Sequence, residues 1–155
     1  MSARARTEEP TGIGFSLALS DNWNNRFLFP GGGYNGSVRP PVGTAAAGDN
    51  PGLARGFAVV STDTGHKGSA FDRTYDVDQQ ASPDFAQVAV DRVAELAKQI
   101  IARYYGQPAR YSYFAGCSTG GWEAMLMAQR YPAEFDGVIF RDPAIRTGFS
   151  RIGND

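Results

Sequence analysis

The sequence predicts an α/β fold with a mostly parallel sheet and flanking helices. Apolar runs of β-forming residues alternate with helical patterns. Strands that are joined by helices through right-handed crossovers lie parallel to one another. Residues 57–60 form a continuous apolar run, which is typical of a strand covered on both faces. The 155 residues are 42% hydrophobic, which is enough to bury the core of one domain.

Three strands are predicted in the first half of the chain. Residues 12–19 alternate apolar with polar or small side chains, and residues 26–29 follow a short Asp/Asn turn. The third strand is the apolar run at residues 57–60. Residues 40–49 are rich in Pro, Gly and Ala, and residues 67–81 are polar without a period, so we expect both segments to be surface loops.

The first predicted helix spans residues 82–105. Its apolar side chains recur at helical spacing, and they are Phe85, Ala89, Val93, Leu96, Ile100 and Tyr104. Ser82 can serve as the N-cap, with Pro83 in the first turn. Gly106, which stands shortly before Pro108, is expected to end the helix.

The rest of the chain continues this alternation. The pattern predicts a strand at residues 111–115, a helix over residues 119–130 and a strand at residues 137–140. The predicted order is therefore β, β, β, α, β, α, β. Residues 1–11 form a polar N-terminal segment that precedes the α/β unit of residues 12–155.

Charge and composition exclude several functional classes. The formal net charge is −1 and no cluster of Lys and Arg is present, so we expect no nucleic-acid binding. No apolar run approaches the ~18 residues that span a bilayer, and the first residues lack the apolar stretch of a secretory signal, so we expect a soluble chain without membrane contact. The single cysteine and single histidine exclude an internal disulfide and a multi-histidine metal site.

The strongest chemical signal is a G-x-S-x-G motif. Gly116-Cys-Ser-Thr-Gly120 follows the strand at residues 111–115 and opens the helix at 119–130, which is the context in which this motif forms a nucleophile elbow. The turn presents Ser118 Oγ at the carboxyl edge of the sheet, and only small neighbours fit the two glycine positions. The Thr119 N–H at the helix start is placed to bind a tetrahedral oxyanion. A plain tight turn between strand and helix is the alternative interpretation.

A second oxyanion donor is expected from an earlier loop. Gly31-Gly-Gly-Tyr34 follows the strand at residues 26–29, and glycine lets backbone N–H groups approach a substrate oxygen closely. Gly32 and Gly33 are the candidate donors, and the sequence does not choose between them. A flexible turn is the alternative. A phosphate-binding loop is disfavoured because neither a helix pattern nor a Gly-Lys-Ser/Thr follows.

Asp63 and His66 lie just beyond the strand at residues 57–60, at the sheet edge where ligands bind in α/β folds. Hydrolase triads of this type run in the order serine, acid, histidine, and His66 precedes Ser118. We therefore interpret His66 as a loop-bracing or substrate-edge residue, with His66 as general base the minor alternative. Asp63 is a candidate residue of the active-site edge. Asp142 stands where some hydrolases carry the acid, but a turn aspartate before Pro143 is the simpler interpretation.

Four ordered segments give a family resemblance. They are Trp23-Asn-Asn-Arg-Phe-Leu28 with Gly31-Gly-Gly, Gly56-Phe-Ala-Val-Val-Ser-Thr-Asp-Thr-Gly-His66, Tyr113-Phe-Ala-Gly-Cys-Ser-Thr-Gly-Gly121, and Gln129-Arg-Tyr-Pro-Ala-Glu-Phe-Asp-Gly137. Together the chain resembles the tannase/feruloyl esterase family of α/β-hydrolases over residues 12–144. The resemblance implies a partial α/β-hydrolase fold, with the lid and C-terminal part of the domain absent.

The same resemblance implies a chemistry. The family hydrolyses aromatic carboxylic esters, such as galloyl or feruloyl esters, through an acyl-enzyme on the serine that matches Ser118. No cofactor is expected beyond a calcium ion that some members hold in the lid. Cys117 matches a cysteine that the family pairs with one beside its catalytic histidine, which implies a secreted or periplasmic protein. We expect Cys117 to be buried beneath the elbow and unpaired in this chain.

The sequence differs from the family pattern at two places, and two interpretations of the chain remain open. Trp122 stands where the family usually has arginine, and Phe140-Arg-Asp-Pro-Ala144 replaces a stretch of small residues. The triad acid and base are not visible among the 37 residues after Ser118, so we expect a catalytically incomplete N-terminal part of an esterase that lacks its C-terminal part. The alternative is an inactive α/β domain that binds a ligand or pairs with a complementing chain.

Overall fold

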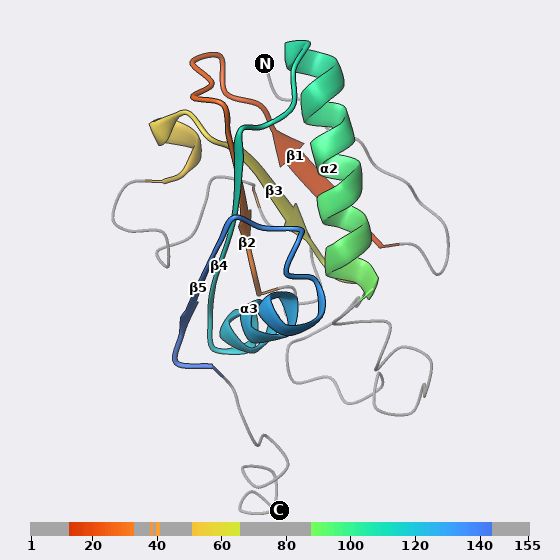
Figure 1. Ribbon diagram of the computed structural model, residues 1–155, viewed down its shortest axis with the longest axis vertical. Helices are drawn as coiled ribbons and strands as arrows, with labels where there is room; N and C mark the ends of the chain where they lie inside the picture. Colours follow the sequence, from red (N-terminus) through yellow and green to blue (C-terminus); the bar gives the residue numbers. More distant parts are fainter. Residues whose placement is uncertain (1–12, 33–37, 39, 41–50, 66–87, 144–155) are drawn as a thin grey trace, which may run out of the picture.

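A computed structural model describes residues 13–32, 38, 40, 51–65 and 88–143, which form a five-stranded sheet with helices packed on it (Figure 1). The elements in chain order are β1 (Phe15–Ala18), β2 (Arg26–Pro30), the 3-10 helix η3 (Leu53–Arg55), β3 (Ala58–Thr62), α2 (Ala89–Tyr105), β4 (Tyr111–Cys117), α3 (Thr119–Arg130) and β5 (Gly137–Arg141). The predicted order of strands and helices is confirmed. The sequence pattern did not indicate η3.

The strands lie in the order β1-β3-β2-β4-β5. β1 is antiparallel to β3, and the other neighbours are parallel, so the predicted mostly parallel sheet is confirmed. β2 and β4 are neighbours, yet β2 leads to β3 on one side and β4 leads to β5 on the other. Neighbouring parallel strands whose connections run in opposite directions leave a crevice at their carboxyl ends, where α/β proteins bind ligands.

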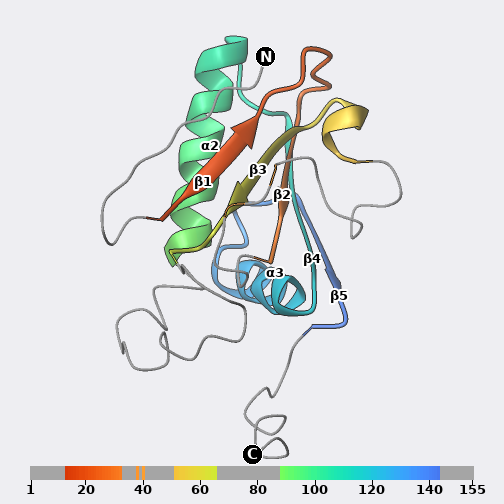
Figure 2. The same ribbon diagram turned by 180° about the vertical axis from the view of Figure 1, so that it is seen from behind.

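Both helices cover the same face of the sheet. In Figure 1 α2 lies in front of β1, and in Figure 2, which is seen from behind, β1 lies in front of α2. The core of this face combines alternate strand residues with the apolar faces of the two helices: Phe15, Leu17, Leu19, Phe27, Phe29, Ala58, Val60, Val90, Val93, Ala94, Ala97, Ile101, Phe114, Ala124, Met127 and Phe135. A smaller cluster on the other face comprises Leu28, Phe57, Val59 and Ala115, with Leu53 of η3 against it.

The element ends follow from local chemistry. Every residue of β3 is buried, as its continuous apolar run predicts. Gly106 ends α2 in the left-handed conformation, with φ of 74°, as predicted. The predicted start of that helix at Ser82 lies outside the described residues. β4 runs two residues further than predicted because Gly116 and Cys117 pair with Phe140 and Arg141 of β5.

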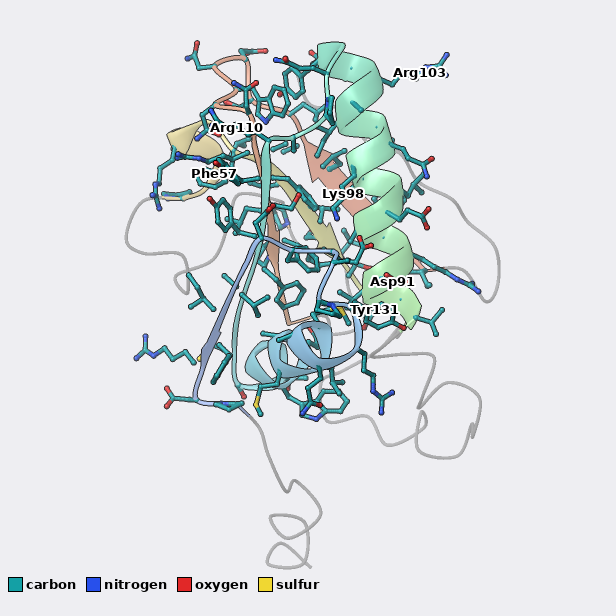
Figure 3. All side chains as sticks on the ribbon, in the orientation of Figure 1. Phe57, Asp91, Lys98, Arg103, Arg110 and Tyr131 are labelled. Carbon is teal, nitrogen blue, oxygen red and sulfur yellow. The ribbon has the colours of Figure 1, made fainter. Side chains whose placement is uncertain are left out.

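An ion pair fastens α2 to the segment that precedes β5. Lys98 Nζ lies 2.8 Å from Glu134 Oε2 and 5.3 Å from the centre of the Phe135 ring. Lys98 projects from α2 toward the α3–β5 connection in Figure 3. Since Phe135 belongs to the core, this ammonium also covers an apolar ring from solvent.

An aromatic contact fastens the other end of α2. Tyr105 stacks on Trp23, with ring centres 3.9 Å apart, and its hydroxyl donates a hydrogen bond to the Ser20 carbonyl. Burial, aided by the neighbouring Tyr104 and Asp21, raises the pKa of Tyr105 from 10.0 to about 12. The folded chain therefore holds this phenol protonated at a pH where the unfolded chain ionises it.

That difference predicts a loss of stability in alkali. Below pH 10 both states keep the Tyr105 proton, whereas between pH 10 and about 12 only the unfolded state releases it, so the free energy of unfolding falls across this window. The free energy of unfolding, measured by urea denaturation at pH 8, 10 and 11, should fall less with pH for Tyr105→Phe than for the unmodified chain. Tyr111→Phe removes a more exposed phenol and is the matched control. Equal pH slopes for the unmodified chain and Tyr105→Phe would contradict this account.

Candidate active site

Ser118 occupies the single residue between β4 and α3. Its backbone has φ of 57° and ψ of −119°, a conformation that residues other than glycine rarely adopt. The side chain is exposed at the carboxyl edge of the sheet. This strained and accessible position is the geometry that the G-x-S-x-G motif requires of a nucleophile.

The two motif glycines are needed because backbone segments touch there. A Cβ on Gly116 would lie 2.0 Å from the Gly120 carbonyl oxygen, and a Cβ on Gly120 would lie 2.6 Å from the backbone of Gly31. Both contacts are with main-chain atoms, which cannot rotate aside as a side chain can. The turn at Ser118 is therefore closed by glycine packed on glycine.

The end of β5 holds the elbow from the other side. The Ser118 N–H donates to the Arg141 carbonyl at 3.1 Å, and the Trp122 N–H donates to the Ser118 carbonyl at 3.1 Å. A Cβ on Gly121 would meet the same Arg141 oxygen at 2.6 Å. β5 thus supplies both a hydrogen bond and a close surface to the turn.

The glycine loop lies directly on the elbow. The Gly31 N–H donates to the Ala115 carbonyl at 2.9 Å, and the Gly32 N–H donates to Glu123 Oε2 at 2.8 Å. A Cβ on Gly120 would lie 2.9 Å from the Gly32 nitrogen. The structure brings Gly32 to the elbow but directs its N–H to Glu123. Gly33, the other candidate donor, lies outside the described residues.

Thr119 is the first residue of α3 and is half-buried beside Ser118. The first N–H groups of a helix have no partner within it and carry its partial positive charge. Thr119 therefore lies at the positive end of α3, next to Ser118. Its role as the first oxyanion donor stays a prediction.

Asp63 follows β3 and is buried. Its Oδ1 accepts hydrogen bonds from the Gly14 and Gly65 N–H groups, each at 2.8 Å, so the carboxylate joins the start of β1 to the turn after β3. Asp63 therefore braces the backbone at this end of β1 and β3. β3 is two strands from β4, a separation of about 10 Å at the usual strand spacing. His66 lies outside the described residues.

The prediction that Cys117 is buried beneath the elbow is wrong. Cys117 is a free, exposed cysteine. Side chains alternate along β4, so Cys117 points to the same face as Ala115 and Tyr113, away from the face that α3 covers.

Asp142 is also exposed, and it forms a surface ion pair with the adjacent Arg141 in a turn with φ of 40°.

One polar residue of the site was not singled out from the sequence. Glu123 is 1% exposed, and it accepts the Gly32 hydrogen bond from within α3. Its place in the predicted helix, three residues after Gly120 and therefore on the same helix face, could have indicated that it lies near the elbow.

Within the ranges given above for the described residues, no group of three or more His, Cys, Asp and Glu side chains could hold a metal ion.

The comparison with protein families decides the assignment. The model of the family described as tannase and feruloyl esterase matches residues 2–151. The chain belongs to the tannase and feruloyl esterase family. The predicted resemblance is confirmed, and the fold is that of the α/β-hydrolases in this family.

Relatives and solved structures agree with this assignment. Mono(2-hydroxyethyl) terephthalate hydrolase of Piscinibacter sakaiensis is 37% identical in an alignment of 143 positions that covers 86% of this chain and 24% of that protein. Probable feruloyl esterase B-2 of Aspergillus flavus is 34% identical, over 90% of this chain and 26% of the relative. The crystal structure of feruloyl esterase B from Aspergillus oryzae superposes with a TM-score of 0.69 at 33% identity, over 90% of this chain and 27% of that one.

The tannin acyl hydrolase of Aspergillus niger superposes with the same TM-score of 0.69 at 27% identity, and the match covers 88% of this chain and 26% of that one. The chain thus spans about a quarter of the length of the family members it matches. Among the described helices, none is long and apolar enough to cross a membrane.

The elbow packing predicts the effect of one methyl group. Gly116→Ala places a Cβ against the Gly120 main chain, so we expect a loss of about 3 kcal/mol or more in the free energy of unfolding. Gly106→Ala is the matched control, because it adds left-handed strain with no described atom within 4 Å of the new Cβ and should cost only about 1–2 kcal/mol. Urea denaturation followed by circular dichroism measures both. A Gly116→Ala chain as stable as Gly106→Ala would show that the glycine packing is not required.

Proposed function

We propose that this chain supplies the nucleophile and oxyanion-binding part of a serine carboxylic ester hydrolase. The observation that carries the proposal is the exposed Ser118 on a strained turn, with the start of α3 on one side and the Gly31–Gly32 backbone packed against the turn. This arrangement combines a nucleophile with backbone donors, which is what acyl transfer needs.

The proposed reaction proceeds in two halves. Ser118 Oγ attacks the ester carbonyl carbon and gives its proton to a general base, a tetrahedral oxyanion forms, and the bond to the alcohol oxygen breaks as that oxygen takes up the proton. Water then attacks the acyl-serine by the same route, which releases the carboxylic acid and restores the Ser118 hydroxyl. Each half passes through an oxyanion that backbone N–H groups stabilise.

The Thr119 N–H is the first proposed oxyanion donor, because it opens α3 beside the nucleophile. Gly33 is favoured as the second over Gly32, since the Gly32 N–H already has a carboxylate acceptor. Removal of one such donor typically costs a factor of about 10²–10³ in turnover.

The proposed substrates are aromatic carboxylic esters of galloyl or feruloyl type. The names of relatives support this class: feruloyl esterases, a tannin acyl hydrolase and a hydrolase of mono(2-hydroxyethyl) terephthalate. The triad acid and base are proposed to come from outside these 155 residues, in a C-terminal part of the protein, with His66 as base the minor alternative.

Three further expectations accompany the proposal. The reaction needs no cofactor, and a calcium ion would belong to a lid outside this chain. The protein is expected to be secreted or periplasmic, where a disulfide can persist. The exposed Cys117 thiol is accessible to the expected partner cysteine near the catalytic histidine.

The proposal predicts how activity depends on Ser118. We expect the 155-residue chain to hydrolyse methyl ferulate and methyl gallate no faster than its Ser118→Ala variant, because the serine proton has no acceptor. We expect the polypeptide encoded by the full reading frame to be active and to lose about 10⁶-fold in turnover on Ser118→Ala.

Three outcomes would change the proposal. Full-length activity that survives Ser118→Ala would overturn the nucleophile. Turnover by the short chain that needs both Ser118 and His66 would make His66 the base. Full-length protein that binds an aromatic ester without hydrolysing it would favour the binding-domain alternative.

A further inference from the structure

We propose that Glu123 is a positioning residue, which holds the glycine loop in register with the nucleophile elbow by accepting the Gly32 N–H. The inference rests on the proposed ester-hydrolase function and adds a residue to it. Glu123 makes no bond to the substrate in this account, since its effect passes through the loop.

Burial of Glu123 requires an explanation. A carboxylate that is 1% exposed is costly in a protein core unless hydrogen bonds replace its water. The Gly32 N–H supplies one at 2.8 Å, across 91 residues of sequence. The bond therefore joins α3, which begins at the elbow, to the loop that follows β2.

The helix geometry directs Glu123 to this loop. Gly120 and Glu123 are three residues apart and lie on one face of α3, and helical side chains lean toward the helix N-terminus. The carboxylate consequently reaches back toward the elbow, where the absence of a Gly120 side chain lets the Gly31–Gly32 backbone approach.

The two loop glycines are held in different ways. A Cβ on Gly31 would lie 2.6 Å from the Phe114 ring and 2.9 Å from Glu123 Oε2, so steric contact fixes this residue. Gly32 has φ of 124°, and no described atom lies within 4 Å of where its Cβ would be. The space at this Cβ position is open among the described atoms and glycine rotates readily, so the hydrogen bond to Glu123 helps to orient the peptide group that carries the Gly32 N–H.

This orientation matters for catalysis because the next peptide group, which begins at the Gly32 carbonyl carbon, carries the Gly33 N–H. That N–H is the proposed second oxyanion donor. Oxyanion donors must be placed within about 0.5 Å of the productive geometry. A displacement of about 1 Å can lower turnover by about 10²-fold. Loss of the Glu123 carboxylate would therefore reduce catalysis without removing any group that touches the substrate.

Hydrogen exchange of the Gly32 amide tests the contact in the 155-residue chain. We expect Glu123→Ala to speed Gly32 exchange about tenfold, and Glu123→Gln, which keeps an acceptor oxygen, to leave it near the original rate. The Gly31 amide, bonded to Ala115, is the internal reference. Met127→Ala is the matched control for general loosening of α3, since Met127 is buried in the core. Gly32 exchange that is unchanged by Glu123→Ala, or raised as much by Met127→Ala, would overturn the contact.

Kinetics of the full-length polypeptide test the consequence. Glu123→Ala should lower kcat about 10²-fold with little change in KM, and Glu123→Gln should restore most of the loss. Ser118→Ala separates the two proposals. If Ser118→Ala stays active, the hydrolase proposal fails. If Ser118→Ala is inactive and Glu123→Ala keeps its kcat, only the role of Glu123 is refuted.

Discussion

The site depends on the contact between three stretches of backbone that approach too closely for any side chain. Gly116 meets Gly120 across the turn, and Gly120 meets Gly31 and Gly32 across the space between β4 and β2. This packing forces the conformation of Ser118, because the chain must reverse from strand to helix within one residue. The positive φ of Ser118 is a strain of about 1–3 kcal/mol, which the close contacts and the bond to Arg141 maintain.

The sheet order explains why these segments meet. β2 and β4 lie side by side, so the loops at their carboxyl ends are neighbours although 86 residues separate Gly32 from Ser118. β2 connects to β3 on one side and β4 connects to β5 on the other, which is the arrangement at which α/β sheets bind ligands. The helices and the buried rings of Phe29 and Phe114 then fix the two strands relative to each other.

Much of the fold was predictable from the sequence because the signals were local. The period of α2, the apolar run of β3 and the glycine that ends α2 each depend on a few neighbouring residues. The elbow was predictable for the same reason. The bond between Glu123 and Gly32 was not, since it depends on which strands become neighbours. The burial of Cys117 was mispredicted because the sequence does not say which face of β4 the helix covers.

The most direct test is a crystal structure of the full-length polypeptide after reaction with an aryl phosphonate, which mimics the tetrahedral intermediate. The account predicts that phosphorus is bonded to Ser118 Oγ and that a phosphonyl oxygen lies about 3 Å from the Thr119 nitrogen, with the Gly32 N–H still on Glu123. An adduct on another residue would contradict it, as would a phosphonyl oxygen that faces solvent away from the start of α3.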